Sequence, residues 1–160
     1  MSTIFRNLEQ RDNKEIADLI RSVFREFDIA RPGTVYFDPT TDDLFSLFLK
    51  HGSVYWIAEE NGKIIGGCGI YSTTGLPEGC CELVKLYLVS SQRGKGTGRK
   101  LLEKSLESAR ELGYKQVYLE SLPELSKAIG LYEKAGFGMI DGPMGNSGHF
   151  GCNIWMLKNL

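Results

Sequence analysis

The residues best suited to chemistry lie in the stretch QRGKGTGRKLLE, at positions 92–103. Gly94, Gly96 and Gly98 occupy alternate positions there, although glycine is costly in a regular element because it loses the most backbone freedom on folding. An apolar-periodic run follows directly, which predicts that a helix begins at these glycines. A helix start presents unpaired N–H groups and a partial positive charge, and glycines let a ligand approach that backbone closely. The stretch therefore predicts a site for an anion.

Two familiar phosphate-binding loops do not match this stretch. A Walker A loop ends in Lys followed by Ser or Thr, and no such pair closes these glycines. A dinucleotide fingerprint needs a third glycine where this chain has Arg99, or Leu101 in the next frame. What remains is R-x-x-G-x-G, from Arg93 to Gly98. A glycine-rich turn without a ligand is also compatible with that pattern.

The surroundings of the glycines favour a diphosphate over an empty turn. The basic residues nearby are Arg93, Lys95, Arg99 and Lys100. Such side chains form charge-assisted hydrogen bonds to phosphate. The preceding residues 80–90, CCELVKLYLVS, are nearly all apolar apart from Glu82 and Lys85, which predicts a strand buried on both faces in the middle of a sheet. The following residues 99–113 predict a helix that ends at Gly113.

The rest of the chain divides into further strands and helices. Strands are predicted at residues 3–9, 114–121, 137–143 and 150–158, with a hairpin over 53–72 that turns at Asn61-Gly62. Helices are predicted at residues 12–27 with Asp12 as N-cap, at 42–52, and from Ser121 to Gly136, where Ser121 and Glu124 form a capping box. The order β-α-α-β-β-β-α-β-α-β-β predicts an α+β fold with a mixed sheet of about seven strands and about four helices on its two faces.

The composition limits the classes of function. The 160 residues suit a single domain, residues 1–160, and a net charge of −1 gives no global basic field for nucleic acid. The four cysteines form no C-x-x-C pair and the two histidines are far apart, so free thiols and no metal site are expected. The polar N-terminus lacks a signal peptide and no run reaches membrane-spanning length, so a cytoplasmic protein without a membrane partner is expected.

Two stretches resemble the hallmarks of one superfamily. ELVKLYLVSSQRGKGTGRKLLE, residues 82–103, resembles the acetyl-CoA-binding region of the GNAT N-acetyltransferases, and AIGLYEKAGF, residues 128–137, resembles their second hallmark. The element order agrees from Ile4 to Lys158. The resemblance implies a GNAT-like fold whose central strand is bulged and splayed from its neighbour. It also implies acetyl-CoA as cosubstrate, no metal, and direct transfer of the acetyl group to a primary amine of a small molecule or peptide.

The resemblance further implies where acetyl-CoA binds. The backbone of Leu86, Tyr87 and Leu88 would hold the acetyl carbonyl and the pantetheine arm. The N–H groups that would wrap the pyrophosphate are those of Arg93, Gly94, Lys95, Gly96, Thr97, Gly98 and Arg99. One departure is Leu125, because family members often carry Asn at that position to contact the CoA arm. Ser126 beside it would be turned about 100° away on a helix.

Tyr132 and Glu82 are the implied catalytic pair. Tyr132 matches the general acid that protonates the departing thiolate, although its place on an apolar helix face also suits a core tyrosine. Glu82 matches a position where some family members carry the general base, and burial would raise its pKa toward the useful range. A glutamate at a strand end facing solvent, with a water chain as the base, is the alternative.

The sequence does not identify the acceptor. Its walls are expected in residues 30–43 and 142–150. Aspartates in the first loop suit a cationic amine, whereas Arg31 suits a carboxylate such as that of an amino acid, so these cues conflict. The alternative function is a catalytically silent CoA-binding sensor or interaction module. The apolar ending CNIWML is compatible with a homodimer and equally with completion of the sheet.

Overall fold

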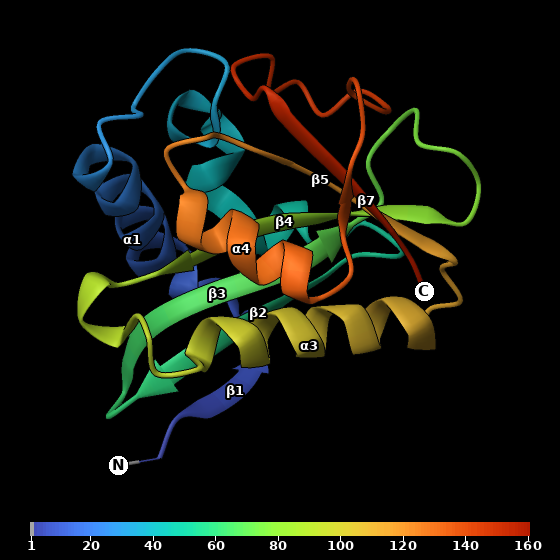
Figure 1. Ribbon diagram of the computed structural model, residues 1–160. Coiled ribbons are helices and arrows are strands. Elements are labelled where there is room, and N and C mark those ends of the chain that lie inside the picture. The colour runs from blue at the N-terminus through green and yellow to red at the C-terminus, as the bar shows by residue number, and fades with distance from the viewer. Residues whose placement is uncertain (1) are drawn as a thin grey trace.

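The computed structural model describes residues 2–160, which form a seven-stranded sheet in the order β1-β2-β3-β4-β5-β7-β6 (Figure 1). The strands are β1 (Ile4–Asn7), β2 (Val54–Glu60), β3 (Lys63–Tyr71), β4 (Cys80–Leu88), β5 (Gln116–Ser121), β6 (Gly138–Met139) and β7 (Ile154–Asn159). All neighbours are antiparallel except β4 and β5, which are parallel. Asn61 and Gly62 join β2 to β3 with φ of 53° and 75°, as the predicted hairpin turn requires.

Helices cover both faces of the sheet. They are α1 (Asn13–Glu26), α2 (Leu44–Leu47), α3 (Thr97–Glu111) and α4 (Ser126–Lys134). Figure 1 shows α3 and α4 in front of the sheet and α1 behind it. The α1 face buries Ile16, Ile20 and Phe24 against the sheet, and the α3 face buries Leu101 and Leu102. Two apolar cores therefore share one sheet, and both hold β4 in place.

The central strands β4 and β5 separate part of the way along their length. Their parallel pairing covers only Cys80–Glu82 against Gln116–Tyr118. Beyond Glu82 the side of β4 that faces β5 has no ladder partner in the described part of the chain, although both strands continue. The mixed seven-stranded sheet, the four helices and the splayed central strand confirm the predicted fold.

A β-bulge in β4 lies at Lys85. On β3, Gly67 pairs with Tyr87 and Gly69 pairs with Val84, so β4 has one residue more than its partner between these pairs. Lys85 takes the extra place with φ of 56°, in the left-handed region. The Tyr55 hydroxyl donates to the Lys85 carbonyl at 2.7 Å and thereby fixes the bulge.

One predicted helix cap is confirmed in position and the other is wrong. Asp12 is the N-cap residue of α1, as predicted, but its carboxylate accepts from the Glu9 N–H and from Arg6 and does not bond to the N–H groups of the helix. Ser121 remains in β5 because it pairs with Ile154 of β7, and α4 begins only at Ser126. The predicted capping box therefore does not form.

Some predicted boundaries are also wrong. The short helix predicted at residues 42–52 is reduced to α2, preceded by a 3-10 turn over Pro39–Asp43. The strand predicted from residue 150 begins at Ile154, and β6 is only two residues long. The C-terminal strand β7 pairs with β5 along all six of its residues, so it completes the sheet.

Candidate active site

A groove of about 530 Å³ lies between the glycine stretch, the start of α4 and the end of α1. It runs along the splayed part of β4, and its lining includes Leu86, Tyr87, Leu88, Gly96, Arg99 and Ser126. The structure thus brings the predicted backbone slot and the predicted anion site together in one groove. Ser126, expected to point away, lies in the lining beside Leu125.

The glycine stretch leaves a row of backbone donors free. Within residues 2–160 the N–H groups of Gly96, Thr97, Gly98 and Arg99 have no hydrogen-bond acceptor, and the first helical bond runs from the Lys100 N–H to the Gly96 carbonyl at 3.1 Å. Gly96 has φ of 86°, which glycine adopts without strain. A Cβ on Gly98 would lie 3.1 Å from Leu88 Cδ1, so glycine there lets α3 pack closely on β4.

The basic side chains of the stretch differ in what they can reach. Arg93 pairs with both carboxylate oxygens of Glu26, donates to the Leu88 carbonyl at 3.0 Å and stacks 5.0 Å from the Phe27 ring. Its charge therefore ties the loop to the end of α1. Lys100 points away from the groove, with Nζ 6.0 Å from the Phe5 ring. Arg99, whose only ion pair in the described residues is an exposed one to Glu103 at 3.7 Å, lines the groove.

A second, smaller cavity of about 50 Å³ adjoins the groove. Leu86, Tyr87 and Leu125 line both spaces. The cavity also contains Glu82 and Tyr132, so the predicted catalytic pair lies in one place. The two spaces meet where β4 separates from β5.

Glu82 is a buried carboxylate. Glu82 is only 3% exposed, and its carboxylate accepts a hydrogen bond of 2.6 Å from the Thr73 hydroxyl. Burial raises the pKa of Glu82 to about 7, although the Thr73 hydrogen bond acts in the opposite direction. The solvent-facing alternative for this glutamate is therefore wrong, and the group can take up and release a proton near neutral pH.

Tyr132 is held in α4 on the same cavity. It is 7% exposed and packs edge-on against Phe137, with ring centroids 5.9 Å apart. Burial raises the pKa of Tyr132 above its usual value, so the phenol stays protonated and can act as a proton donor. Its hydroxyl makes no hydrogen bond within residues 2–160 and remains available to a ligand.

The two predicted acceptor loops do meet. The Gly151 N–H donates to the Gly33 carbonyl at 2.7 Å, and His149 Nε2 lies 2.7 Å from a carboxylate oxygen of Asp38. Of the polar residues expected in these loops, His149 alone lines the small cavity. Arg31 instead forms an exposed ion pair with Glu124 at 2.6 Å.

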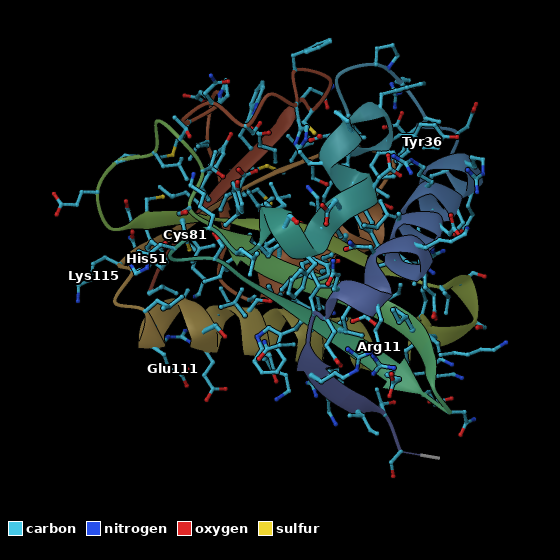
Figure 2. The ribbon with its side chains drawn as sticks, turned by 180° about the vertical axis from the view of Figure 1, so that it is seen from behind. Arg11, Tyr36, His51, Cys81, Glu111 and Lys115 are labelled. Atoms are coloured by element: carbon cyan, nitrogen blue, oxygen red, sulfur yellow. The ribbon has the colours of Figure 1, made fainter. Side chains whose placement is uncertain are left out.

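Other predicted acceptor residues lie away from the cavity. Figure 2 shows Tyr36 beside α1, where its hydroxyl accepts from Arg25. Asp42 pairs with Arg21, again on α1. These side chains fasten the loop to the helix and do not reach the site.

Sequence reasoning missed four polar residues of the cavity, which are Lys85, Glu120, Ser121 and Cys152. Lys85 stood out in the sequence as one of two charges in an apolar strand. Its role was hidden because the side on which it emerges depends on the bulge. Glu120 is positioned by the Tyr118 and Ser147 hydroxyls, each donating at 2.6 Å.

The fold and this arrangement define a class of protein, the CoA-dependent acyltransferases with a splayed mixed sheet. The profile of the Acetyltransferase (GNAT) family matches residues 15–137. The uncharacterized N-acetyltransferase YjgM of Escherichia coli K12 is 41% identical over 160 residues, covering 99% of this chain and 96% of that protein. Human N-acetyltransferase 8 is 31% identical over 114 residues, covering 67% of this chain and 50% of that protein. The chain belongs to the GNAT family of acetyltransferases.

Solved structures support the same fold. A GNAT-family acetyltransferase from Staphylococcus aureus Mu50 superimposes with a TM-score of 0.89 at 22% identity, covering 99% of each chain. The PaiA N-acetyltransferase of Thermoplasma acidophilum, solved with coenzyme A, superimposes with a TM-score of 0.78 at 18% identity over the full length of both chains. At these identities the likeness concerns the fold.

Two kinds of feature are absent from residues 2–160. No three or more His, Cys, Asp or Glu side chains are grouped in a way that could hold a metal ion. None of the helices in this range is both long enough and apolar enough to cross a membrane.

Proposed function

We propose that this protein transfers the acetyl group of acetyl-CoA directly to a primary amine of a small molecule or peptide. The observation that carries the proposal is the junction of the two spaces at Leu86, Tyr87 and Leu125. One space ends at a row of free helix N–H groups, and the other contains a buried carboxylate and a protonated phenol. An acyl donor and an acceptor can therefore meet at the splay without entering by the same route.

The groove suits the CoA moiety. The free N–H groups of residues 96–99 and the Arg99 guanidinium offer donors for the diphosphate, and the apolar walls suit a pantetheine arm. We assign the cradle to residues 94–99 and the acetyl slot to the backbone of residues 86–88. Arg93 leaves the predicted set of donors because its N–H already donates to the Ser90 carbonyl at 3.3 Å. When bound, acetyl-CoA supplies an activated thioester carbonyl. A β4 N–H at the unpaired edge would stabilise negative charge on that carbonyl oxygen.

The small cavity provides the proton transfers. Glu82, with a pKa of about 7, takes a proton from the ammonium form of the acceptor so that its nitrogen becomes nucleophilic. Tyr132 donates its phenolic proton to the departing thiolate. No residue of this cavity needs to form a covalent bond to the acetyl group, because holding both reactants at the splay supplies much of the rate.

A thiol-release assay tests the proposal. Acetyl-CoA is offered with a panel of amino acids, polyamines and lysine-containing peptides, while CoA binding is measured by calorimetry. We expect CoA release that depends on the amine. CoA binding without amine-dependent release by any member of the panel would favour a CoA-binding sensor instead.

A further inference from the structure

Lys85 is a buried lysine whose amino group has no carboxylate partner among the described residues. The residue is 8% exposed and lines the small cavity, and no carboxylate in residues 2–160 lies within 4.0 Å of its ammonium group. Burial lowers the pKa of Lys85, while the charges of Asp38, Glu82 and Cys152 act in the opposite direction. Burying an ammonium group is costly unless something pairs with it.

The carboxylates around Lys85 already have other partners. Glu82 accepts from Thr73 at 2.6 Å, and Asp38 accepts from Thr40 at 2.7 Å and contacts His149. The carboxylate of Glu120 accepts from two hydroxyls. None of these acids turns to Lys85, so the anion that would balance its charge is not part of the described chain.

The bulge is what brings Lys85 into the cavity. Cys81 and Leu83 point into the α3-side core, so regular alternation would place residue 85 in that apolar core as well. The extra residue breaks the alternation, and Leu86 and Leu88 take up the α3 side instead. A residue with φ of 56° is strained unless it is glycine. Lysine at this position therefore adopts a strained backbone conformation that places its amino group in the cavity.

We propose that Lys85 binds the carboxylate of the acceptor, and that the acceptor is a free α-amino acid. The inference rests on the proposed acetyl transfer to an amine and names its substrate class. A free amino acid carries both charges that the cavity complements, because Glu82 and Glu120 attract the ammonium end and Lys85 attracts the carboxylate. A cavity of about 50 Å³ encloses only these two ends, so the side chain of the amino acid lies toward the opening.

Matched acceptors test this assignment. The kcat/KM for acetylation is measured for the L-amino acids and for their α-carboxamides, which keep the amine and lose the carboxylate. We expect at least one acid to exceed its amide by about 10- to 100-fold, the range expected for a hydrogen bond between charged groups. Amides that react as well as the acids throughout the panel would overturn the proposal.

Substitutions then connect the preference to Lys85. Lys85→Met should lower the ratio of kcat/KM for the preferred acid to kcat/KM for its amide by about 10- to 100-fold, and Lys85→Arg should restore part of that ratio. Both acceptors are compared well above the pKa of Glu82, because loss of the Lys85 charge also raises that pKa and changes the rate with either acceptor near neutral pH. Lys63→Met, at an exposed hairpin position, is the matched control and should leave the ratio unchanged. An equal loss on acid and amide in Lys85→Met would mean that Lys85 acts on chemistry or folding, and would overturn the proposal.

A binding measurement separates this inference from the proposed function. The same amino acids and amides are titrated calorimetrically into CoA-saturated protein, in which no acetyl group can move. Binding of an acid that weakens in Lys85→Met would support the carboxylate site even if no amine released CoA. Amine acetylation without selective binding of any acid would leave the enzymatic function intact and refute the carboxylate site.

Discussion

Burial of Glu82 sets the pH at which a base can operate in this site. Because its pKa is about 7, we expect kcat/KM to rise with pH through about 7 and to fall below it as the carboxylate becomes protonated. This rise, the acid limb of the pH profile, should stay at the same pH when the amine is changed. A rise that reflects ionisation of the amine itself should move with the pKa of the amine. Glu82→Gln should lose the limb and about 100-fold or more in rate. An unchanged limb in this variant would show that another group is the base.

Thr73 provides a graded control for the same residue. Its hydroxyl donates to Glu82 and lowers the pKa of that carboxyl, so Thr73→Val should move the rise of kcat/KM to higher pH.

The stability of the fold should also depend on the protonation of Glu82. The folded-state pKa lies above the usual 4.5, so the ionisation of Glu82 destabilises the fold as pH rises through about 7. Glu82→Gln should therefore gain stability relative to the wild type at pH 8, measured by urea unfolding.

The role of the Tyr132 hydroxyl can be tested by a substitution that removes a single non-hydrogen atom. Tyr132→Phe removes the phenolic proton but keeps the ring against Phe137, so the fold and CoA affinity should be retained. We expect kcat to fall by about 100-fold or more, the range for a lost general acid. Tyr118→Phe, which removes a hydroxyl bonded to Glu120, is the comparison variant. Full activity in Tyr132→Phe at every pH would assign it to the core alone.

The sequence predicted a residue of the candidate site where a local motif surrounded it. Glu82 and Tyr132 stood in stretches resembling family hallmarks, and the structure places both in one cavity. Lys85 was not predictable as a site residue because the direction of its side chain depends on a bulge fixed by Tyr55, thirty residues earlier. Arg31 suggested a carboxylate site, but its partner Glu124 lies 93 residues away in sequence.

At the scale of elements, the start of α3 should bind the diphosphate through its backbone. Gly96 and Gly113 lie at opposite ends of α3, both have φ of 86°, and a Cβ on either would meet open space. Gly96→Glu and Gly113→Glu therefore introduce the same strain and the same charge. We expect Gly96→Glu to weaken CoA binding by about 100-fold or more, since a carboxylate would face the diphosphate, and Gly113→Glu to leave it unchanged. Equal CoA affinities by calorimetry would refute the diphosphate cradle.

Glycines inside two other elements should respond in opposite directions. Gly130 lies within α4 with no atom near an added Cβ, so Gly130→Ala should stabilise the fold by about 0.5–1 kcal/mol. An added Cβ on Gly69 of β3 would lie 2.3 Å from the Val54 carbonyl oxygen and would also press on Tyr55, so Gly69→Ala should cost about 3 kcal/mol. Urea unfolding measures both changes. Similar stabilities for the two variants would contradict this description of the bulge.

Element boundaries were predictable only where local signals were not overruled by pairing. Asn61-Gly62 gave the hairpin because the turn chemistry and the strand register agree. Ser121 and Glu124 matched a capping box, but Ser121 extends β5 opposite Ile154, which is 33 residues later in the chain. A ladder to a distant strand outweighed the local cap, and the sequence around Ser121 contains no sign of that strand.

At the scale of the whole molecule, one sheet connects two apolar cores and two loops. The order of strands and helices was predictable because each element carries its own apolar period. The meeting of residues 30–43 with residues 142–150 was not predictable, because it depends on contacts between distant residues, such as that between His149 and Asp38 and the bond from the adjoining Gly151 to Gly33. The acceptor side of the site therefore exists only in the complete fold, whereas the CoA side is largely built from one continuous stretch.

This sharing of one sheet predicts that residues 1–160 unfold as a single domain. Trp56 of β2 donates to Ser108 of α3, and Trp155 of β7 pairs with Glu120 of β5, so tryptophan fluorescence reports on both halves of the sheet. Far-UV circular dichroism reports on the helices of both faces. We expect the two signals to give one coincident transition. CoA at about 100 times its Kd should raise the stability by about 2.7 kcal/mol and the Tm by roughly 5–10 °C in both signals. Two separate transitions, or a CoA shift confined to one signal, would contradict a single domain.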